Sequence, residues 1–134
     1  MAKSNENQRP NIVLGKISDK NNRPLSNLIV QVYDRDMRGE TLLSETITDR
    51  DGNYQTTWLR EQLGEREKKS ADLLIKVFSK GNKDPLFVSD IDNVRFNAHQ
   101  KENINITINN VIEKNKIELL NLKALYNLSE SVAT

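Results

Sequence analysis

The sequence contains no cysteine and only one histidine, His99. The lack of cysteine excludes a disulfide scaffold, a thiolate metal site and a cysteine nucleophile. A single imidazole excludes any site that needs two histidines. The polar residues around His99, Asn97 to Lys101, include no evident partner that would orient the ring as a general base. We therefore expect His99 to be a solvated loop residue.

The sequence also lacks an excess of charge of one sign. It has 20 Lys and Arg against 19 Asp and Glu, with both signs interspersed, which argues against nucleic acid or an anionic membrane as a partner. No long apolar run indicates a membrane span, and Met1 to Pro10 has no apolar core of a signal peptide. We expect residues 1–10 to be a disordered lead, and the chain to be cytoplasmic until it is released or exported non-classically within a larger assembly.

What the sequence does contain is one small core in a polar envelope, since 36% of its 134 residues are hydrophobic. From Asn11 onward, short β-branched runs are separated by Asn, Asp, Gly and Pro. This pattern predicts an all-β domain over residues 11–110, a seven-stranded antiparallel β-sandwich. The expected strands are 12–18, 28–34, 41–48, 54–58, 72–80, 86–91 and 103–109.

Face assignments follow from alternation along two of these strands. In the second strand, Leu28, Val30 and Val32 share the face expected to enter the core. In the third, Leu43 and Ile47 share a face with Glu45 between them, which indicates a strand near an edge of its sheet.

Two segments depart from the strand pattern. Residues 59–70 are strongly charged and lack β-branched residues, which predicts a short charged crossover helix. Residues 111–134 lack Gly and Pro and carry apolar residues at helical spacing, which predicts a C-terminal amphipathic helix. This tail either covers the sandwich or docks on another chain; the candidate partner-binding residues are Ile117, Leu120, Leu122, Leu125, Tyr126 and Leu128.

The segment Asp49-Arg50-Asp51-Gly52-Asn53-Tyr54 predicts a tight turn between two strands. Asp49 can accept hydrogen bonds from turn amides, Gly52 can supply a positive φ, and the Tyr54 ring can pack at the sandwich corner. Asp49, Asp51 and Asn53 also have the spacing that opens a calcium loop. Gly52 is not at the position where an EF-hand loop has its glycine, and no glutamate follows at the twelfth position of such a loop. The turn is therefore the favoured interpretation, and a Ca²⁺ site is a weak alternative.

With Gly15 and Pro24, this turn completes a motif that resembles the carboxypeptidase regulatory-like, transthyretin-like β-sandwich domains. The fold-motif residues are Gly15, Pro24, Asp49, Gly52 and Tyr54, and the one departure is Asn22 where the family usually has Gly. A closer likeness in the Asp34–Arg38 stretch and in Phe96-Asn97-Ala98 is to domains of large modular bacterial proteins, including relatives of insecticidal toxin-complex subunits.

The resemblance implies an immunoglobulin-like or transthyretin-like sandwich that serves as an accessory module. The catalytic relatives of this fold, hydroxyisourate hydrolases and intradiol dioxygenases, need several histidines, and this chain has only His99. We therefore expect a non-catalytic protein-interaction or assembly module of a larger bacterial secreted or toxin-like complex, without a cofactor, acting through an edge strand or the tail. The alternative is a carbohydrate- or small-ligand-binding accessory domain with an aromatic platform formed by Tyr33, Tyr54, Trp58 and Tyr126.

Overall fold

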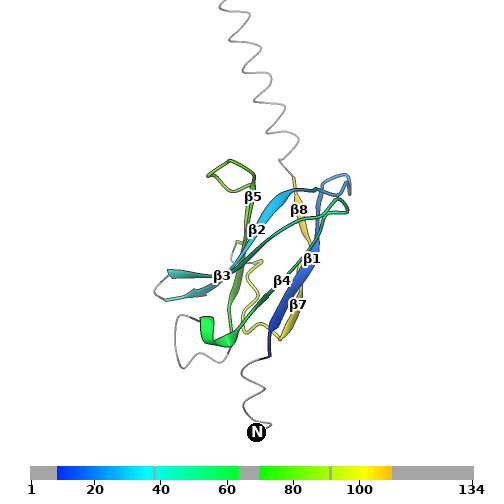
Figure 1. The fold of residues 1–134 in the computed structure, drawn as a ribbon. Helices are drawn as coiled ribbons and strands as arrows, with labels where there is room; N and C mark the ends of the chain where they lie inside the picture. Colours follow the sequence, from blue (N-terminus) through cyan, green and yellow to red (C-terminus); the bar gives the residue numbers. More distant parts are fainter. Residues whose placement is uncertain (1–8, 38, 64–69, 91, 110–134) are drawn as a thin grey trace, which may run out of the picture.

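The computed structural model of the chain describes residues 9–37, 39–63, 70–90 and 92–109. They form a β-sandwich of two facing four-stranded sheets, as Figure 1 shows. The all-β sandwich predicted from the sequence is therefore confirmed. The elements are β1 (Asn11–Asp19), β2 (Leu28–Asp36), β3 (Gly39–Ile47), β4 (Asn53–Trp58), η1 (Arg60–Gln62), β5 (Leu73–Ser79), β6 (Phe87–Val88), β7 (Lys101–Asn103) and β8 (Ile106–Ile108).

One sheet has the order β4-β1-β7, with β8 also pairing with β1, and the other has the order β3-β2-β5-β6. β4 runs antiparallel to β1, whereas β7 and β8 run parallel to it. Two details of the predicted fold are therefore wrong. The described residues form eight strands rather than seven, and the first sheet is mixed rather than antiparallel throughout.

The additional strand arises because the expected strand 103–109 is interrupted in its middle. The Ile104 N–H still donates to the Leu14 carbonyl at 2.8 Å, but the next amide of β1, that of Lys16, donates to the side-chain oxygen of Asn105 at 2.9 Å. The Ile104 carbonyl turns inward and accepts a hydrogen bond from the Tyr54 hydroxyl at 2.6 Å. This local rotation separates β7 from β8.

The core lies between the sheets and follows the alternation of the strands. Leu28, Val30 and Val32 of β2 are all buried, which confirms the face assigned to them from the sequence. They pack against buried residues of the facing sheet and of the neighbouring β5, including Val13, Ile17, Ile75, Val77, Ile106 and Ile108.

Strand β3 does not keep the alternation predicted for it. Its register with β2 shifts between Val32 and Tyr33, so that Ser44 pairs with Val32 and Leu42 with Tyr33. Leu43 is the extra residue of this bulge and is buried, whereas Ile47 is 48% exposed. The prediction that Leu43 and Ile47 share a face is therefore wrong, because the bulge at Leu43 breaks the alternation of β3.

The only helical element among the described residues is the single 3₁₀ turn η1, in the first part of the expected crossover helix. The rest of that crossover, residues 64–69, lies outside the described residues, as do residues 1–8 of the expected lead. The predicted C-terminal helix with its candidate residues Ile117, Leu120, Leu122, Leu125, Tyr126 and Leu128 also lies outside them. Within the described part of the chain, no helix is long and apolar enough to cross a membrane.

Candidate functional site

The turn at Asp49 is closed by its own side chain. Asp49 Oδ1 accepts hydrogen bonds from the amides of Asp51 at 2.9 Å and Asn53 at 3.0 Å, and Gly52 has a φ of +77°. These are the predicted roles of Asp49 and Gly52. The carboxylate is thus engaged within the turn, and no group of three or more His, Cys, Asp or Glu that could hold a metal occurs in the described part of the chain.

A second turn, after β1, repeats this construction residue for residue. Asp19 Oδ1 accepts from the amides of Asn21 at 2.8 Å and Arg23 at 3.0 Å, at the same sequence offsets as in the Asp49 turn. Asn22 occupies the place of Gly52 and has a φ of +64°. Asparagine adopts this conformation more readily than most residues, which explains how it replaces the usual glycine.

The two turns lie at the same end of the sandwich, as Figure 1 shows. The Ile17 amide donates to the Gly52 carbonyl at 2.8 Å, and a Cβ added to Gly52 would lie 2.5 Å from the Ile17 carbonyl oxygen and 3.1 Å from Pro24. Gly52 and Pro24 are therefore structural residues that hold the two turns together.

The remaining motif residues, Gly15 and Tyr54, meet at the Ile104 carbonyl. A Cβ added to Gly15 would lie 2.0 Å from the Ile104 oxygen, so only glycine allows this approach. The Tyr54 side chain is buried, and burial raises the pKa of its hydroxyl well above the usual range while Arg95 lowers it to a smaller extent. All five motif residues thus have structural contacts at this end or in the core.

The described aromatic residues do not form the platform considered for sugar binding. Tyr54 and Trp58 are 4% and 3% exposed and belong to the core cluster. Tyr33 is half-buried on the outer face of β2, and Tyr126 lies outside the described residues. His99 is exposed, and its backbone N–H donates to Glu102 Oε2 at 2.7 Å.

The feature that the structure adds is an open edge along the second half of β3. Thr48 bonds to β2 through its amide, which donates to the Leu28 carbonyl at 2.9 Å. Backbone groups of an antiparallel strand alternate in direction, so those of Ile47 and Glu45 point away from β2. No other strand pairs with β3, and among the described residues no backbone partner is found for these groups. The first half of the edge is different, because Gln62 Nε2 of η1 donates to the Leu43 carbonyl at 2.7 Å.

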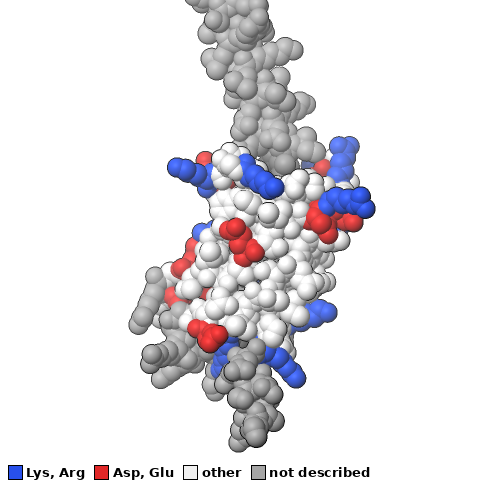
Figure 2. Space-filling model, viewed as in Figure 1, with Lys and Arg blue, Asp and Glu red and all other residues white. Residues whose placement is uncertain are grey.

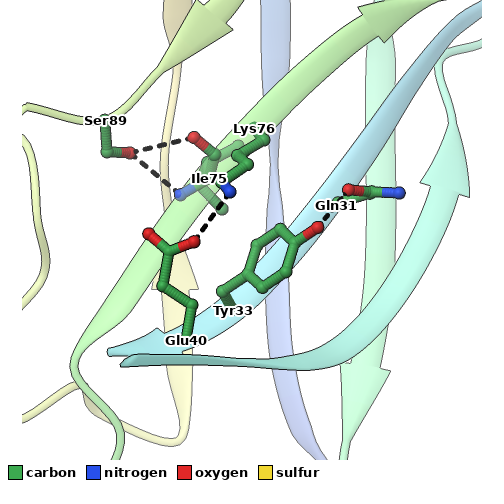
Figure 3. A network of polar contacts seen from close by, with 6 residues as sticks. All are labelled: Gln31, Tyr33, Glu40, Ile75, Lys76 and Ser89. Carbon is green, nitrogen blue, oxygen red and sulfur yellow. Dashed lines mark hydrogen bonds and ion pairs between the residues drawn. The ribbon is translucent and has the colours of Figure 1, made fainter. Parts of the chain in front are cut away.

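The opposite side of the same sheet is closed. The outward backbone groups of β5 are bonded by following segments: Leu73 exchanges two hydrogen bonds with Arg95, and the Val77 carbonyl accepts from the Leu86 amide at 2.7 Å. Between them, the Ile75 amide donates to Ser89 Oγ at 2.9 Å (Figure 3), and the Ser89 amide donates to the Ile75 carbonyl at 2.9 Å. The backbone groups of β5 on this side of the sheet are therefore satisfied, unlike those of the second half of β3.

A groove of about 550 Å³ lies beside the open edge. Residues from four strands line it: Thr46 and Ile47 of β3, Asn53 and Gln55 of β4, Leu14 and Lys16 of β1, and Asn103 of β7 are among them. In Figure 2 the charged side chains gather toward the margins of the molecule, and most of the middle of this face, which β1 and β4 cross in Figure 1, carries no charge. We call the Ser44–Ile47 segment with this groove the β3 docking edge.

Side chains on the outer face of the sheet hold the docking edge in place. Glu45 Oε2 accepts a hydrogen bond from Gln31 Nε2 at 2.8 Å, and Gln31 accepts one from the Tyr33 hydroxyl. Lys76 Nζ lies 4.6 Å from the centre of the Tyr33 ring and 2.7 Å from Glu40 Oε1 (Figure 3). This network links β5, β2 and β3, so the Glu45 side chain is engaged on the sheet face and does not cover the edge.

The sequence indicated an edge position for β3 from Glu45, but it did not identify the open backbone groups of Glu45 and Ile47. Their direction depends on the ladder with β2, and the bulge at Leu43 that precedes them has no distinct sequence signal.

Comparisons with known proteins bear only on the fold. No family model and no curated protein matches the sequence. A solved 9R-lipoxygenase from Cyanothece PCC8801 is similar over 80% of this chain, with a TM-score of 0.56 and 20% identity. This chain spans only 19% of the lipoxygenase. The dioxygenase domain of a dioxygenase carbohydrate-binding protein fusion from Streptomyces sp. SirexAA-E has a TM-score of 0.46 and 14% identity, over 75% of this chain and 79% of that one.

Proposed function

We propose that the domain is a non-catalytic protein-interaction module that binds an extended segment of another polypeptide at the β3 docking edge. The observation that carries this proposal is the pair of outward backbone groups at Glu45 and Ile47, which have no backbone partner among the described residues. An added strand would satisfy them through main-chain hydrogen bonds, the mode known as β-augmentation.

The surroundings of the edge favour such a partner. Ile47 is 48% exposed and could contact every second side chain of an added strand. The groove beside Ile47 offers room for the side chains that point the other way. The segment contains no proline or lysine, the residues that commonly protect an edge strand from pairing. These features distinguish it from the other side of the sheet, where β6 and following segments bond to β5.

The wider context of the proposal comes from the sequence. The resemblance to carboxypeptidase regulatory-like, transthyretin-like domains of large modular bacterial proteins supports a role in the assembly of a secreted or toxin-like complex. In that setting the apolar residues of segment 111–134 would provide a second contact to the same assembly.

Site-specific photocrosslinking in the full chain tests the proposal. A photoreactive residue replaces either Ile47 on the docking edge or Val88 on the opposite edge, a matched position that is also β-branched and 42% exposed. We expect position 47 to crosslink one partner chain through a contiguous segment, and position 88 not to do so. Equal crosslinking from both positions would contradict the proposal.

Two variants at Glu45 separate the backbone from the side chain. Glu45→Pro removes the outward N–H but leaves the inward bonds to β2, and proline is tolerated on edge strands. Glu45→Ala keeps the N–H and removes only the side chain. We expect crosslinking from position 47 to be lost in Glu45→Pro and retained in Glu45→Ala; loss in both variants or in neither would exclude main-chain pairing as its basis.

The alternative function, binding of a carbohydrate or small ligand, no longer has the aromatic platform as its basis. Tyr54 and Trp58 are buried, so they present no ring face to a sugar. A small-ligand role would have to rest on another cavity.

A further inference from the structure

The other sheet also has an open edge beside the groove, along β4. The Leu14 carbonyl of β1 points away from β4 and accepts a hydrogen bond from the Ile104 amide at 2.8 Å. Leu14 pairs with Gln55 of β4, so these two residues face each other without mutual hydrogen bonds. The N–H and C=O groups of Gln55 therefore point away from β1, and by alternation so do those of Thr57.

These outward groups of β4 are unsatisfied in the same way as those of β3. β1 is the only strand that pairs with β4, and among the described residues no backbone partner is found for the outward groups of Gln55 and Thr57. Both side chains are exposed, and β4 contains no proline or charged residue that would protect its edge. The open stretch of β4 thus matches that of β3, where the outward groups belong to Glu45 and Ile47.

The two open stretches end at the same two features. At one end, the Asp49 amide donates to the Asn53 carbonyl at 2.9 Å, and Asp49 Oδ1 accepts from the Asn53 amide at 3.0 Å. At the other end, Gln62 of η1 bonds to both sides: its Nε2 donates to the Leu43 carbonyl at 2.7 Å, and its Oε1 accepts from the Leu59 amide at 2.7 Å. We call the two open stretches, framed by the Asp49 turn and Gln62, the edge window.

Both sides of the edge window lie beside one groove. Ile47 of β3 and Gln55 of β4 line this groove, and β3 and β4, which the Asp49 turn joins directly, are in contact with each other (Figure 1). A chain that binds along β3 in the groove therefore also covers the outward groups of β4. Backbone groups that are covered without a hydrogen-bond partner are unfavourable, so the bound chain has to provide partners for β4 as well.

One added strand cannot satisfy both edges, because facing sheets lie about 10 Å apart whereas hydrogen-bonded strands lie about 4.8 Å apart. We infer that the partner contributes two short strands of one chain, one paired with β3 at Glu45 and Ile47 and the other with β4 at Gln55 and Thr57. A turn that crosses between the two sheets joins them. This inference rests on the proposed function and specifies its partner as a strand–turn–strand segment rather than a single extended peptide.

Photocrosslinking from both edges of the window tests the inference. In the full chain, a photoreactive residue replaces Ile47, Gln55 or Thr107; Thr107 is exposed like Gln55 and lies in β8, on the other side of the same sheet. We expect positions 47 and 55 to crosslink the same partner chain through two different segments of it, and position 107 to crosslink neither segment.

The outcomes separate this inference from the proposed function. Crosslinking of one and the same segment from positions 47 and 55, or of nothing from position 55 while position 47 still crosslinks, would overturn the inference and leave the proposed function standing. Crosslinking of the same segments from position 107 would also overturn the inference. No crosslinking from position 47 would overturn both.

Two variants at Thr57 show whether β4 pairs through its main chain. Thr57→Pro removes the outward N–H and leaves the inward bonds to β1, whereas Thr57→Ala keeps the N–H. We expect Thr57→Pro to abolish crosslinking from position 55 and to weaken partner binding by at least about tenfold, because two linked strands reinforce each other's binding. Thr57→Ala should change neither, and equal effects of the two variants would overturn the inference. Amide hydrogen exchange needs no substitution: unchanged exchange at Gln55 in a complex that slows exchange at Ile47 would also overturn it.

Discussion

Gly15→Ala should destabilise the sandwich through one defined collision. The added Cβ would lie 2.0 Å from the Ile104 carbonyl oxygen and 3.1 Å from the Tyr54 ring. Since Gly15 lies in the middle of β1, paired with Tyr54 of β4, neither neighbour can move without disturbing the sheet. The Ile104 carbonyl has to shift, and this weakens both the Tyr54 hydroxyl bond to it and the Ile104 amide bond to Leu14.

The expected magnitude follows from these two effects. Overpacking in a well-packed interior costs typically about 1–3 kcal/mol, and each intramolecular hydrogen bond contributes about 0.5–1.5 kcal/mol. We therefore expect the free energy of unfolding to fall by about 2–6 kcal/mol. The total free energy of unfolding of a domain of this size is about 5–15 kcal/mol, so the loss is a large share of its stability.

Urea unfolding followed by the fluorescence of Trp58, the only tryptophan, measures this loss. Thr57→Ala is the matched control, because Thr57 lies on the adjacent β4 and its side chain is exposed. We expect the control to change the free energy of unfolding by less than about 0.5 kcal/mol. A loss below about 1 kcal/mol in Gly15→Ala would refute the argument that Gly15 is required for close approach.

Three further predictions concern buried polar groups and turns. Burial raises the pKa of Tyr54 above its ordinary value of 10.0, so the folded state keeps the proton that the unfolded state releases. The stability that this group contributes is complete below pH 10 and is lost above it, by up to about 1.4 kcal/mol per pH unit. When the free energy of unfolding in urea is measured from pH 9 to 11, it should decline less steeply in Tyr54→Phe than in the wild type. Thr48→Val should lower the free energy of unfolding by about 1–3 kcal/mol, because Thr48 Oγ1 accepts from the Leu28 amide and donates to the Leu25 carbonyl. A loss below about 0.5 kcal/mol, the usual scatter of surface variants, would contradict this. In thermal unfolding, Asn22→Gly should match or exceed the wild-type stability, whereas Asn22→Ala should lower it by about 1 kcal/mol, since φ is +64° there; equal effects of the two would argue against backbone strain.

Much of the fold followed from local sequence signals. The β-branched alternation of β2 predicted its buried face, and the Asp49 turn followed from residues that bond within a few positions of each other. Asn22 also fitted its place in the motif, although the reason, a left-handed backbone, became visible only in the structure. Such features depend on neighbours in the sequence, so the sequence specifies them.

The features that the sequence did not predict depend on contacts between distant segments. The split between β7 and β8 arises where Ile104 meets Gly15 and Tyr54. The hydrogen bond from the Tyr54 hydroxyl to the Ile104 carbonyl spans 50 positions of the sequence. The direction of the open amides of Glu45 and Ile47 depends on the register of β3 with β2. They stay open because β2 is the only strand that pairs with β3 among the described residues. The cavity beside Trp58, about 270 Å³ in volume, is lined by four separate segments, so no local motif marks it.

Amide hydrogen exchange at Glu45 and Ile47, without and with the partner chain captured by crosslinking, tests the β3 docking edge most directly. In the domain alone, these amides should exchange much faster than those of Leu73 and Ile75, which donate to Arg95 and Ser89. Added partner should slow exchange at Glu45 and Ile47 and leave Leu73 and Ile75 unchanged. Unchanged exchange at Glu45 and Ile47 in the saturated complex would contradict the proposal that the partner binds as an added strand.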